Sequence, residues 1–325
     1  ELCSRPRIIS SASYVGDKEG KGPLRECFDK ICRDDTLGLD SWEQAESRMF
    51  ESAVRVALAK IKRQSDDLSC LLGGDLLNQI ISSGFAAREI RAPFIGLYGA
   101  CSTISEGLML GGMLVDGGFA ELAACAASSH FSAAERQFRY PLEMGVQAVP
   151  SSQRTVTGAG SIIIQAAGEF RPGAGNVFEH VALTGGTIGS VEDFGITDAN
   201  NMGAAMAPAA FKTIKTHLSD YSRRAEDYDR IITGDLGIFG SDMLYELLRG
   251  EGIEIADRHE DCGKLMFSPE QNVNCGASGC GCAATIMSSW FLPKIESGEI
   301  RRVLFLATGA LMSPVSSLQG ESIPS

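Results

Sequence analysis

The sequence predicts an α/β fold made of two duplicated halves, each with a mainly parallel mixed sheet that helices cover on both faces. Apolar runs of strand length alternate with longer helical patterns along the 325 residues, which is typical of such sheets. Residues 71–76 (LLGGDL) are echoed by residues 231–236 (IITGDL), and residues 99–102 (GACS) by residues 276–279 (GASG). Both matches occur in the same order with the same elements between them, which indicates an internal duplication.

The first half begins with a strand at residues 7–13, followed by a polar, glycine-rich excursion over residues 14–40. Ser41 and Gln44 have the spacing of a capping box, and apolar residues then recur at helical spacing up to Ile61, so an amphipathic helix is expected. The remaining elements expected here are a strand at 68–73, a helix at 76–90, a strand at 94–98, an apolar helix at 103–115, and strands at 122–127 and 161–167.

Cys101 follows the strand at residues 94–98 and opens the apolar helix. A tight turn between strand and helix would leave its sulfur at a helix N-terminus, where unpaired N–H groups and the helix dipole favour a thiolate. This position suits a nucleophilic cysteine. It suits equally a small buried hydrophobic residue, the common role of a free cysteine, and the neighbouring residues leave both interpretations open.

Candidate functional residues follow the strand at residues 122–127. That strand ends at Ser128, Ser129 and His130, and residues 131–154 are expected to form a loop that is too long for a plain connection. The arginines of this region are Arg136, Arg139, Arg154 and Arg171. They could lie on a solvated face, and equally some could hold carboxylates, which the guanidinium group binds in a bidentate manner.

The second half repeats the order of elements. A helix is expected from Met202, capped by the Asp and Asn residues before it, which lack the Gly and terminal Glu of a calcium loop. A strand at 228–233, an apolar helix at 283–292 and a strand at 303–307 follow. Halves related by a pseudo-twofold axis place equivalent turns together, so Cys101 is expected to face residues 274–279.

Composition excludes several classes of protein. The hydrophobic content of 44% is that of a globular chain, and the net charge of −12 argues against nucleic acid or anionic lipid as a direct partner. The N-terminal residues lack a signal-peptide pattern, so ten free thiols in a reduced compartment are expected. The longest uncharged run, residues 271–293, contains Asn, Gly and Ser and predicts a buried helix after a glycine-rich turn rather than a membrane span.

A group of cysteines in the second half invites comparison with zinc sites. The residues concerned are His259, Cys262, Cys275, Cys280 and Cys282. No paired CxxC motif is present, and the last three lie in or beside a glycine-rich turn, so the favoured interpretation is that these cysteines belong to the core. No metal site and no cofactor are expected.

Several motifs carry a resemblance. A cysteine at a strand-to-helix turn inside duplicated halves resembles the thiolase and ketoacyl synthase superfamily, whose fold has five layers, α/β/α/β/α. More narrowly, YGACST, AASSH, AERQFRYP, TVTGAGS, NCGASGCGC and QGESIPS are similar to the stage V sporulation protein AD family of spore-forming bacteria, from about residue 7 onward. The expected halves are residues 1–170 and 171–325.

This resemblance implies a function that composition and spacing do not. It implies binding of dipicolinic acid (pyridine-2,6-dicarboxylate), as the free acid or as its calcium salt, for uptake into the developing spore and release at germination. It also implies peripheral attachment to the spore inner membrane, co-encoded SpoVA membrane proteins as partners, and a homodimer formed by extending the sheet. With no lipidation motif and no transmembrane helix in the sequence, attachment through a protein partner is the expectation.

The sequence departs from the enzymes of the superfamily at two positions. Condensing enzymes surround the cysteine with two His, or His and Asn, which assist thiolate formation and hold an oxyanion. The first position is occupied by Asp235, and the second, in residues 272–279, has no histidine, although Asn274 could replace an asparagine. A non-catalytic protein is therefore expected, the alternative being an acyltransferase or ketoacyl synthase that uses Cys101 with unconventional partners and acyl-CoA or acyl carrier protein thioesters.

A flat dicarboxylate needs an apolar slot with hydrogen-bond donors at both ends. We expect this slot beneath Cys101, in the place of the acyl channel that the resemblance implies, with Asp235 in the same cavity. The residues expected to contact the ligand are Cys101, Ser128, Ser129, His130, Arg139 and Asp235. Arg139 is expected to hold the second carboxylate.

Overall fold

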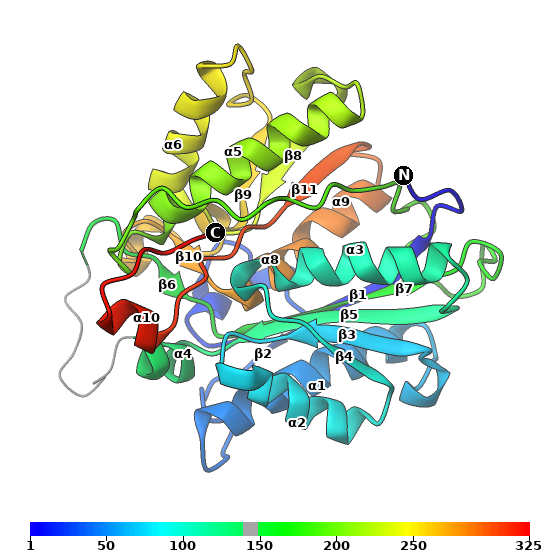
Figure 1. Ribbon diagram of the computed structural model, residues 1–325. Coiled ribbons are helices and arrows are strands. Elements are labelled where there is room, and N and C mark those ends of the chain that lie inside the picture. The colour runs from blue at the N-terminus through cyan, green and yellow to red at the C-terminus, as the bar shows by residue number, and fades with distance from the viewer. Residues whose placement is uncertain (139–148) are drawn as a thin grey trace.

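The computed structural model describes residues 1–138 and 149–325, which form five layers (Figure 1). Helices α1 and α2 cover one sheet, α3 and α8 lie between the two sheets, and α5 and α6 cover the second sheet. The bounds of these helices are Trp42–Lys60 (α1), Ile81–Ile90 (α2), Thr103–Asp116 (α3), Met202–Asp220 (α5), Gly237–Arg249 (α6) and Cys280–Ile286 (α8). Shorter helices are Phe131–Phe138 (α4), Cys262–Leu265 (α7), Leu292–Glu296 (α9) and Pro314–Leu318 (α10).

The first sheet has the strand order β2-β1-β7-β5-β3-β4. Its strands are Arg7–Val15 (β1), Lys30–Ile31 (β2), Cys70–Gly74 (β3), Phe94–Gly96 (β4), Leu122–Ser129 (β5) and Gly158–Gln165 (β7). β3 is parallel to β4 and β5, whereas β7 lies antiparallel between β5 and β1. The eight residues of β5 are all buried, as expected for a strand with a neighbour on each edge and helices on both faces.

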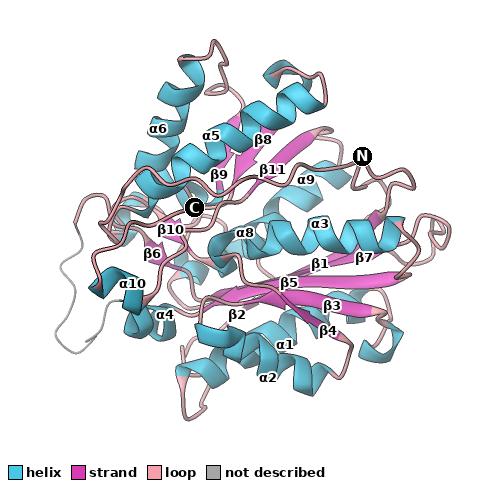
Figure 2. Ribbon diagram, in the orientation of Figure 1, coloured by secondary structure: helices cyan, strands magenta, loops and turns pink. Residues whose placement is uncertain are grey.

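The second sheet is smaller (Figure 2). Strands Arg230–Thr233 (β8), His259–Asp261 (β9) and Val303–Leu306 (β11) are all parallel, in the order β11-β8-β9. Two further short strands, Arg154–Thr155 (β6) and Ala277–Ser278 (β10), pair in parallel and connect the two halves.

The two halves match in structure without a gap over 35 residues. Helices α1 and α5 are each 19 residues long, and a constant offset of 160 residues relates residues 42–76 to 202–236. The turn after each helix is closed by equivalent aspartates, Asp67 bonding the Gln64 amide and Asp227 the Arg224 amide, both at 2.8 Å. The strand order β5-β3-β4 of the first sheet recurs as β11-β8-β9 in the second.

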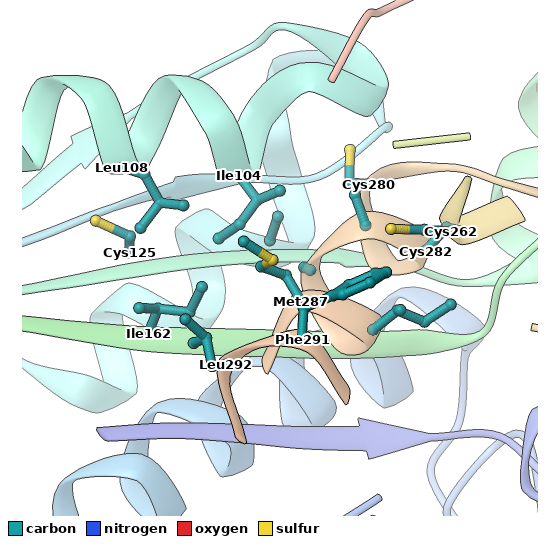
Figure 3. Close-up of a cluster of buried hydrophobic side chains, with 14 of the residues drawn as sticks. Ile104, Leu108, Cys125, Ile162, Cys262, Cys280, Cys282, Met287, Phe291 and Leu292 are labelled. Atoms are coloured by element: carbon teal, nitrogen blue, oxygen red, sulfur yellow. The ribbon is translucent and has the colours of Figure 1, made fainter. Parts of the chain in front are cut away.

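The layer between the sheets forms the largest part of the core (Figure 3). Side chains of α3, such as Ile104 and Leu108, pack there against Met287, Phe291 and Leu292 from the segment that follows α8. Cys262, Cys280 and Cys282 are fully buried in the same cluster. These cysteines therefore contribute to packing, as the sequence predicts.

Several sequence-based expectations need correction. The predicted loop 131–154 begins with helix α4, and its residues 139–148, which include Arg139, lie outside the described residues. The expected helix at 283–292 begins already at Cys280 and passes through a π-helical turn, Met287–Phe291. Only half of the capping box forms, because Ser41 accepts from the Gln44 amide whereas Gln44 accepts from Asp40. Among the described residues, no helix is both long and apolar enough to cross a membrane.

Candidate functional site

Cys101 lies in a tight turn between strand β4 and helix α3. The turn is possible because Ala100 adopts a left-handed conformation, with φ of 49°, which an Ala residue adopts only when surrounding contacts enforce it. A short 3-10 turn, Ala100–Ser102, then leads into α3. The Cys101 side chain is 4% exposed, so the prediction of a buried cysteine at the start of the central helix is confirmed.

The second glycine-rich turn faces Cys101 from the other half. The Gly279 amide contacts the Cys101 thiol, and the thiol of Cys280 bonds the Ala100 carbonyl at 2.8 Å. The two equivalent turns therefore meet at the interface of the halves, as the predicted duplication requires.

Asp235 lies beside Cys101. It directly follows β8, is fully buried and interacts with the Cys101 thiol. Its Oδ2 atom accepts a hydrogen bond from the Gly279 amide at 2.8 Å. The carboxyl group thus stands beside the sulfur, at the position where the resemblance to condensing enzymes implies a histidine.

This environment keeps the thiol neutral. Burial raises the pKa of Cys101 well above its ordinary value, and the neighbouring Asp235 charge raises it further, whereas the Gly279 amide lowers it. Burial also raises the pKa of Asp235 from 3.8 to about 7. The start of α3 therefore does not produce a thiolate, because desolvation outweighs the stabilisation by backbone N–H groups.

Three buried side chains in or beside the second glycine-rich turn have polar atoms without a hydrogen-bond partner of normal geometry in the described part of the chain. These atoms are Asp235 Oδ1, Ser278 Oγ and Gln153 Oε1. Gln153 belongs to the same group because its Nε2 donates to the carbonyls of Asp235 and Ala277, at 2.7 and 2.9 Å. No pattern in the sequence indicates Gln153, which lies in a short polar segment without apolar periodicity.

The three residues at the end of β5 do not act together. Ser128 donates to Glu46 on α1 at 3.0 Å, and His130 bonds the Asp35 carbonyl at 2.8 Å. Ser129 points toward the central layer, where it donates to the Val156 carbonyl and accepts from the Gly281 amide at the start of α8. Successive strand residues face opposite sides of the sheet, which explains why only Ser129 lies on the side of α8.

A pair of buried carboxyl groups was not predicted. Glu46 on α1 and Asp75 at the end of β3 are 1% and 0% exposed, and burial raises the pKa of both. Asp75 accepts from the Leu77 amide and from the amide and hydroxyl of Ser83, at 2.7–2.8 Å. Asp75 is the counterpart of Asp235, and a charged residue on the apolar face of α1 was the available signal for Glu46.

Other expected residues lie elsewhere. Asn274 is exposed and donates to the Val149 carbonyl at 2.9 Å, so the interpretation that it replaces a catalytic asparagine is wrong. Arg136 forms an ion pair with Glu43. Arg154 stacks over the Phe131 ring, 3.6 Å from its centre.

A cavity of about 610 Å³ lies beside this site. Tyr98, Gly99 and Ser102, the neighbours of Cys101, are among its lining residues, but neither Cys101 nor Asp235 is, so the slot predicted beneath Cys101 does not coincide with this cavity. The cavity extends between α3, α5, β11 and the extended segment of residues 181–191. It is therefore close to the cysteine turn but belongs mainly to the second sheet.

Comparison with solved structures identifies the fold. OleA of Xanthomonas campestris, in a variant form, matches with a TM-score of 0.62 and 12% identity over 98% of this chain and 97% of that chain. The 3-oxoacyl-(acyl carrier protein) synthase III FabH of Pseudomonas aeruginosa PAO1 matches with a TM-score of 0.57 and 11% identity over 98% and 96%. The fold is therefore thiolase-like, as the sequence predicts.

Comparison with known sequences identifies the family. Stage V sporulation protein AD of Bacillus subtilis (strain 168) is 44% identical over 317 residues, which cover 98% of this chain and 91% of that protein. The family model described as Stage V sporulation protein AD (SpoVAD) matches residues 1–325. The chain thus belongs to the stage V sporulation protein AD family.

Proposed function

We propose that this chain is a non-catalytic protein that binds dipicolinic acid on a thiolase-like fold, for uptake into the developing spore and release at germination. The proposal that the protein is not a catalyst rests on the buried contact between Cys101 and Asp235. Membership of the family supports a role in sporulation. Dipicolinic acid is the ligand that the resemblance of the sequence to that family implies.

The contact between Cys101 and Asp235 opposes the chemistry of condensing enzymes. Those enzymes need a thiolate, and donors for the negative oxygen that develops during acyl transfer. Above pH 7 the Asp235 carboxylate would repel both charges. Below pH 7 it is protonated, but burial still holds Cys101 as a thiol. Acyl transfer is therefore disfavoured both above and below pH 7.

The oxygen atoms without partners support binding of dipicolinate as its calcium salt. Asp235 Oδ1, Ser278 Oγ and Gln153 Oε1 are all oxygen atoms, and calcium prefers oxygen ligands. A bare dianion beside Asp235 would be repelled, whereas calcium would neutralise both groups. Ligand carboxylates would complete the coordination of the cation.

Calorimetry tests this proposal. Dipicolinate is titrated into the protein with calcium present and with calcium removed by a chelator. Cys101→Trp should abolish binding by filling the site, and Asp235→Asn should weaken it by about tenfold or more. Asp193→Asn, an exposed aspartate, is the matched control and should bind as the parent does. Unchanged affinity in both site variants would place the ligand elsewhere, and no binding by the folded parent protein would refute the function.

Acyl transfer is the second candidate, favoured by the position of Cys101 at the start of α3 and by the thiolase-like fold. Incubation with acetyl-CoA or malonyl-CoA followed by intact-mass measurement separates the two functions. We expect no adduct. A stable acyl group on Cys101 of the parent protein, absent from a Cys101→Ala variant, would support the enzyme instead.

We further propose that the protein attaches to the spore inner membrane through the co-encoded SpoVA membrane proteins. The net charge of −12 disfavours direct binding to anionic lipid. Loss of membrane association in a strain without those membrane proteins is the expected result. Binding of the purified protein to vesicles of phosphatidylglycerol would contradict it.

A homodimer formed by extending the first sheet is also proposed. Strand β4 is the edge of that sheet, and large apolar side chains are exposed on β4 (Ile95), on α2 (Ile81 and Phe85) and on α3 (Leu110 and Met113). An exposed edge strand with apolar neighbours is a suitable place for a second copy to pair. Sedimentation should show a dimer that Ile95→Lys dissociates, while Val315→Lys, an exposed residue on α10, leaves it intact.

A further inference from the structure

The first turn of helix α6 is capped by residues from two other segments of the chain. Asp261, at the end of β9, accepts from the Leu236 amide at 2.8 Å and from the Gly237 amide at 3.0 Å. The next two amides of α6 donate to the carbonyl and to the thiol of Cys275, at 2.9 and 3.1 Å. The free N–H groups that open a helix are thus satisfied here without Asp235, although Asp235 directly precedes them.

A chain of buried hydrogen bonds holds the Asp261 carboxylate in this position. The Thr233 hydroxyl donates to Asp261 Oδ2 at 2.6 Å. Because that hydroxyl has a single proton, it accepts from His259 Nε2, 2.8 Å away, and His259 Nδ1 in turn accepts from the Tyr245 hydroxyl at 2.7 Å. Burial lowers the pKa of His259 from 6.5 to about 3, so the ring is neutral and carries the one N–H that this order requires. Every donor in the chain therefore points toward Asp261.

The aspartate of the first half is used differently. At the offset of 160 residues, Asp75 is the counterpart of Asp235. Asp75 uses both of its oxygens close to its own turn, where it accepts from the Leu77 amide and from the amide and hydroxyl of Ser83. Asp235 instead accepts from the Gly279 amide across the interface of the halves, and its Oδ1 atom has no hydrogen-bond partner of normal geometry within residues 1–138 and 149–325.

Strand register explains why the halves differ. Thr233 is paired with Asp261 across β8 and β9, which lie side by side in Figure 1, and the equivalent pair across β3 and β4 is Gly73 with Gly96. The side chain of Ile80 fills the space at Gly96, where an added Cβ would lie 2.3 Å from its Cδ1 atom. The first half thus has an apolar contact where the second half has a carboxylate, and its aspartate is left to cap its own turn.

We infer that Asp261 is a positioning residue, which caps the start of α6 so that Asp235 is free to face Cys101 and a ligand there. Thr233 and His259 act through Asp261, because they fix the direction of its carboxylate. This role rests on the proposed function for the ligand alone, since the orientation of Asp235 can be measured with no ligand present. Without the Asp261 cap, Asp235 should turn toward the uncapped amides of α6, as its counterpart does in the first half.

Hydrogen exchange of the Gly279 amide, followed by NMR in the protein without ligand, tests the inference. The bond to Asp235 protects this amide, so Asp261→Asn and Thr233→Val should each make it exchange about tenfold or more faster. Thr233→Ser keeps the hydroxyl and should exchange as the parent does. If Asp261→Asn does not fold, the two variants of Thr233 decide.

Ser241→Ala is the matched control, because it removes another buried hydroxyl, which donates to the Gly237 carbonyl of α6 at 2.6 Å. Exchange of the Gly279 amide should not change in this variant. Unchanged exchange in both Asp261→Asn and Thr233→Val would overturn the inference. Equally fast exchange in Ser241→Ala would also overturn it, since the effect would then be a general loss of stability.

Binding of calcium dipicolinate is the second measurement. In calorimetry, Asp261→Asn and Thr233→Val should bind it about tenfold more weakly than the parent, and Ser241→Ala should bind it equally well. A parent protein that binds no dipicolinate would refute the proposed function, whereas exchange of the Gly279 amide would still decide the role of Asp261. Full affinity in both variants, with Asp235 still bonded to Gly279 in their crystal structures, would overturn that role.

Discussion

Replacing Asp235 by Asn should stabilise the protein, and by an amount that depends on pH. The substitution keeps the shape of the side chain and its acceptor for the Gly279 amide but removes the carboxyl group whose pKa burial raises from 3.8 to about 7. A shift of about three pH units, at 1.36 kcal/mol each, corresponds to about 4 kcal/mol. This is an upper estimate for the cost of ionising Asp235 in the folded protein.

Proton linkage determines how the effect of Asp235 on the free energy of unfolding changes with pH. A carboxyl group with a raised pKa in the folded state does not lower the free energy of unfolding below about pH 4, because it is protonated in both the folded and the unfolded protein. As the pH rises from the ordinary pKa to the raised pKa, the loss of unfolding free energy that this group causes grows, and it reaches its full size above pH 7. Asp235→Asn should therefore match the parent near pH 4 and exceed it by about 2–4 kcal/mol at pH 8.

Urea unfolding at pH 4, 5.5 and 8 measures this difference. Asp75→Asn is the matched control, since it alters the equivalent residue of the first half. Burial raises the pKa of Asp75 as well, so Asp75→Asn should also gain stability as the pH rises, but the loss of hydrogen bonds from Leu77 and Ser83, which an amide cannot fully replace, should leave it less stable than Asp235→Asn at every pH. A difference between Asp235→Asn and the parent that stays constant from pH 4 to pH 8 would refute the argument from burial.

Further predictions concern other buried groups. Cys101 should react with iodoacetamide at least about 100-fold more slowly than the exposed Cys3, because it is buried and its pKa is raised; equal rates by peptide mass mapping would contradict its burial. Glu46→Gln should raise the unfolding free energy at pH 8 by about 1–3 kcal/mol relative to pH 5, because it removes a carboxyl group whose pKa burial raises; no dependence on pH in a urea series would contradict this. Ser129→Ala should lower the unfolding free energy by about 1–3 kcal/mol, because the Val156 carbonyl and the Gly281 amide lose their partner; an exposed control, Ser219→Ala, should change it by less than about 0.5 kcal/mol.

Much of the fold could be predicted because it depends on local patterns. Apolar runs and the repeated LLGGDL and IITGDL segments located the strands, the halves and the position of Asp235. The site was harder, because a side chain's direction depends on strand register and on partners distant in sequence. Ser128 and Ser129 are adjacent, yet one bonds Glu46 on α1 and the other Gly281 on α8. Nothing in the sequence near Ser128 indicates Glu46, 82 residues away.

The gapless match between residues 42–76 and 202–236 has a consequence for how the two halves diverged. Seven positions, from Ala45 and Ala205 to Leu76 and Leu236, keep the same residue, and five of them cluster in the turn and strand end around Arg63–Leu76. The intervals that follow are unequal, since Cys101 lies 26 residues after Asp75, whereas Ser278 lies 43 after Asp235. Changes in chain length since the duplication were therefore tolerated after the aspartate but not before it. The helix, turn and strand ending at that aspartate form an ancestral unit of fixed length, and new properties arose in the segments attached to it.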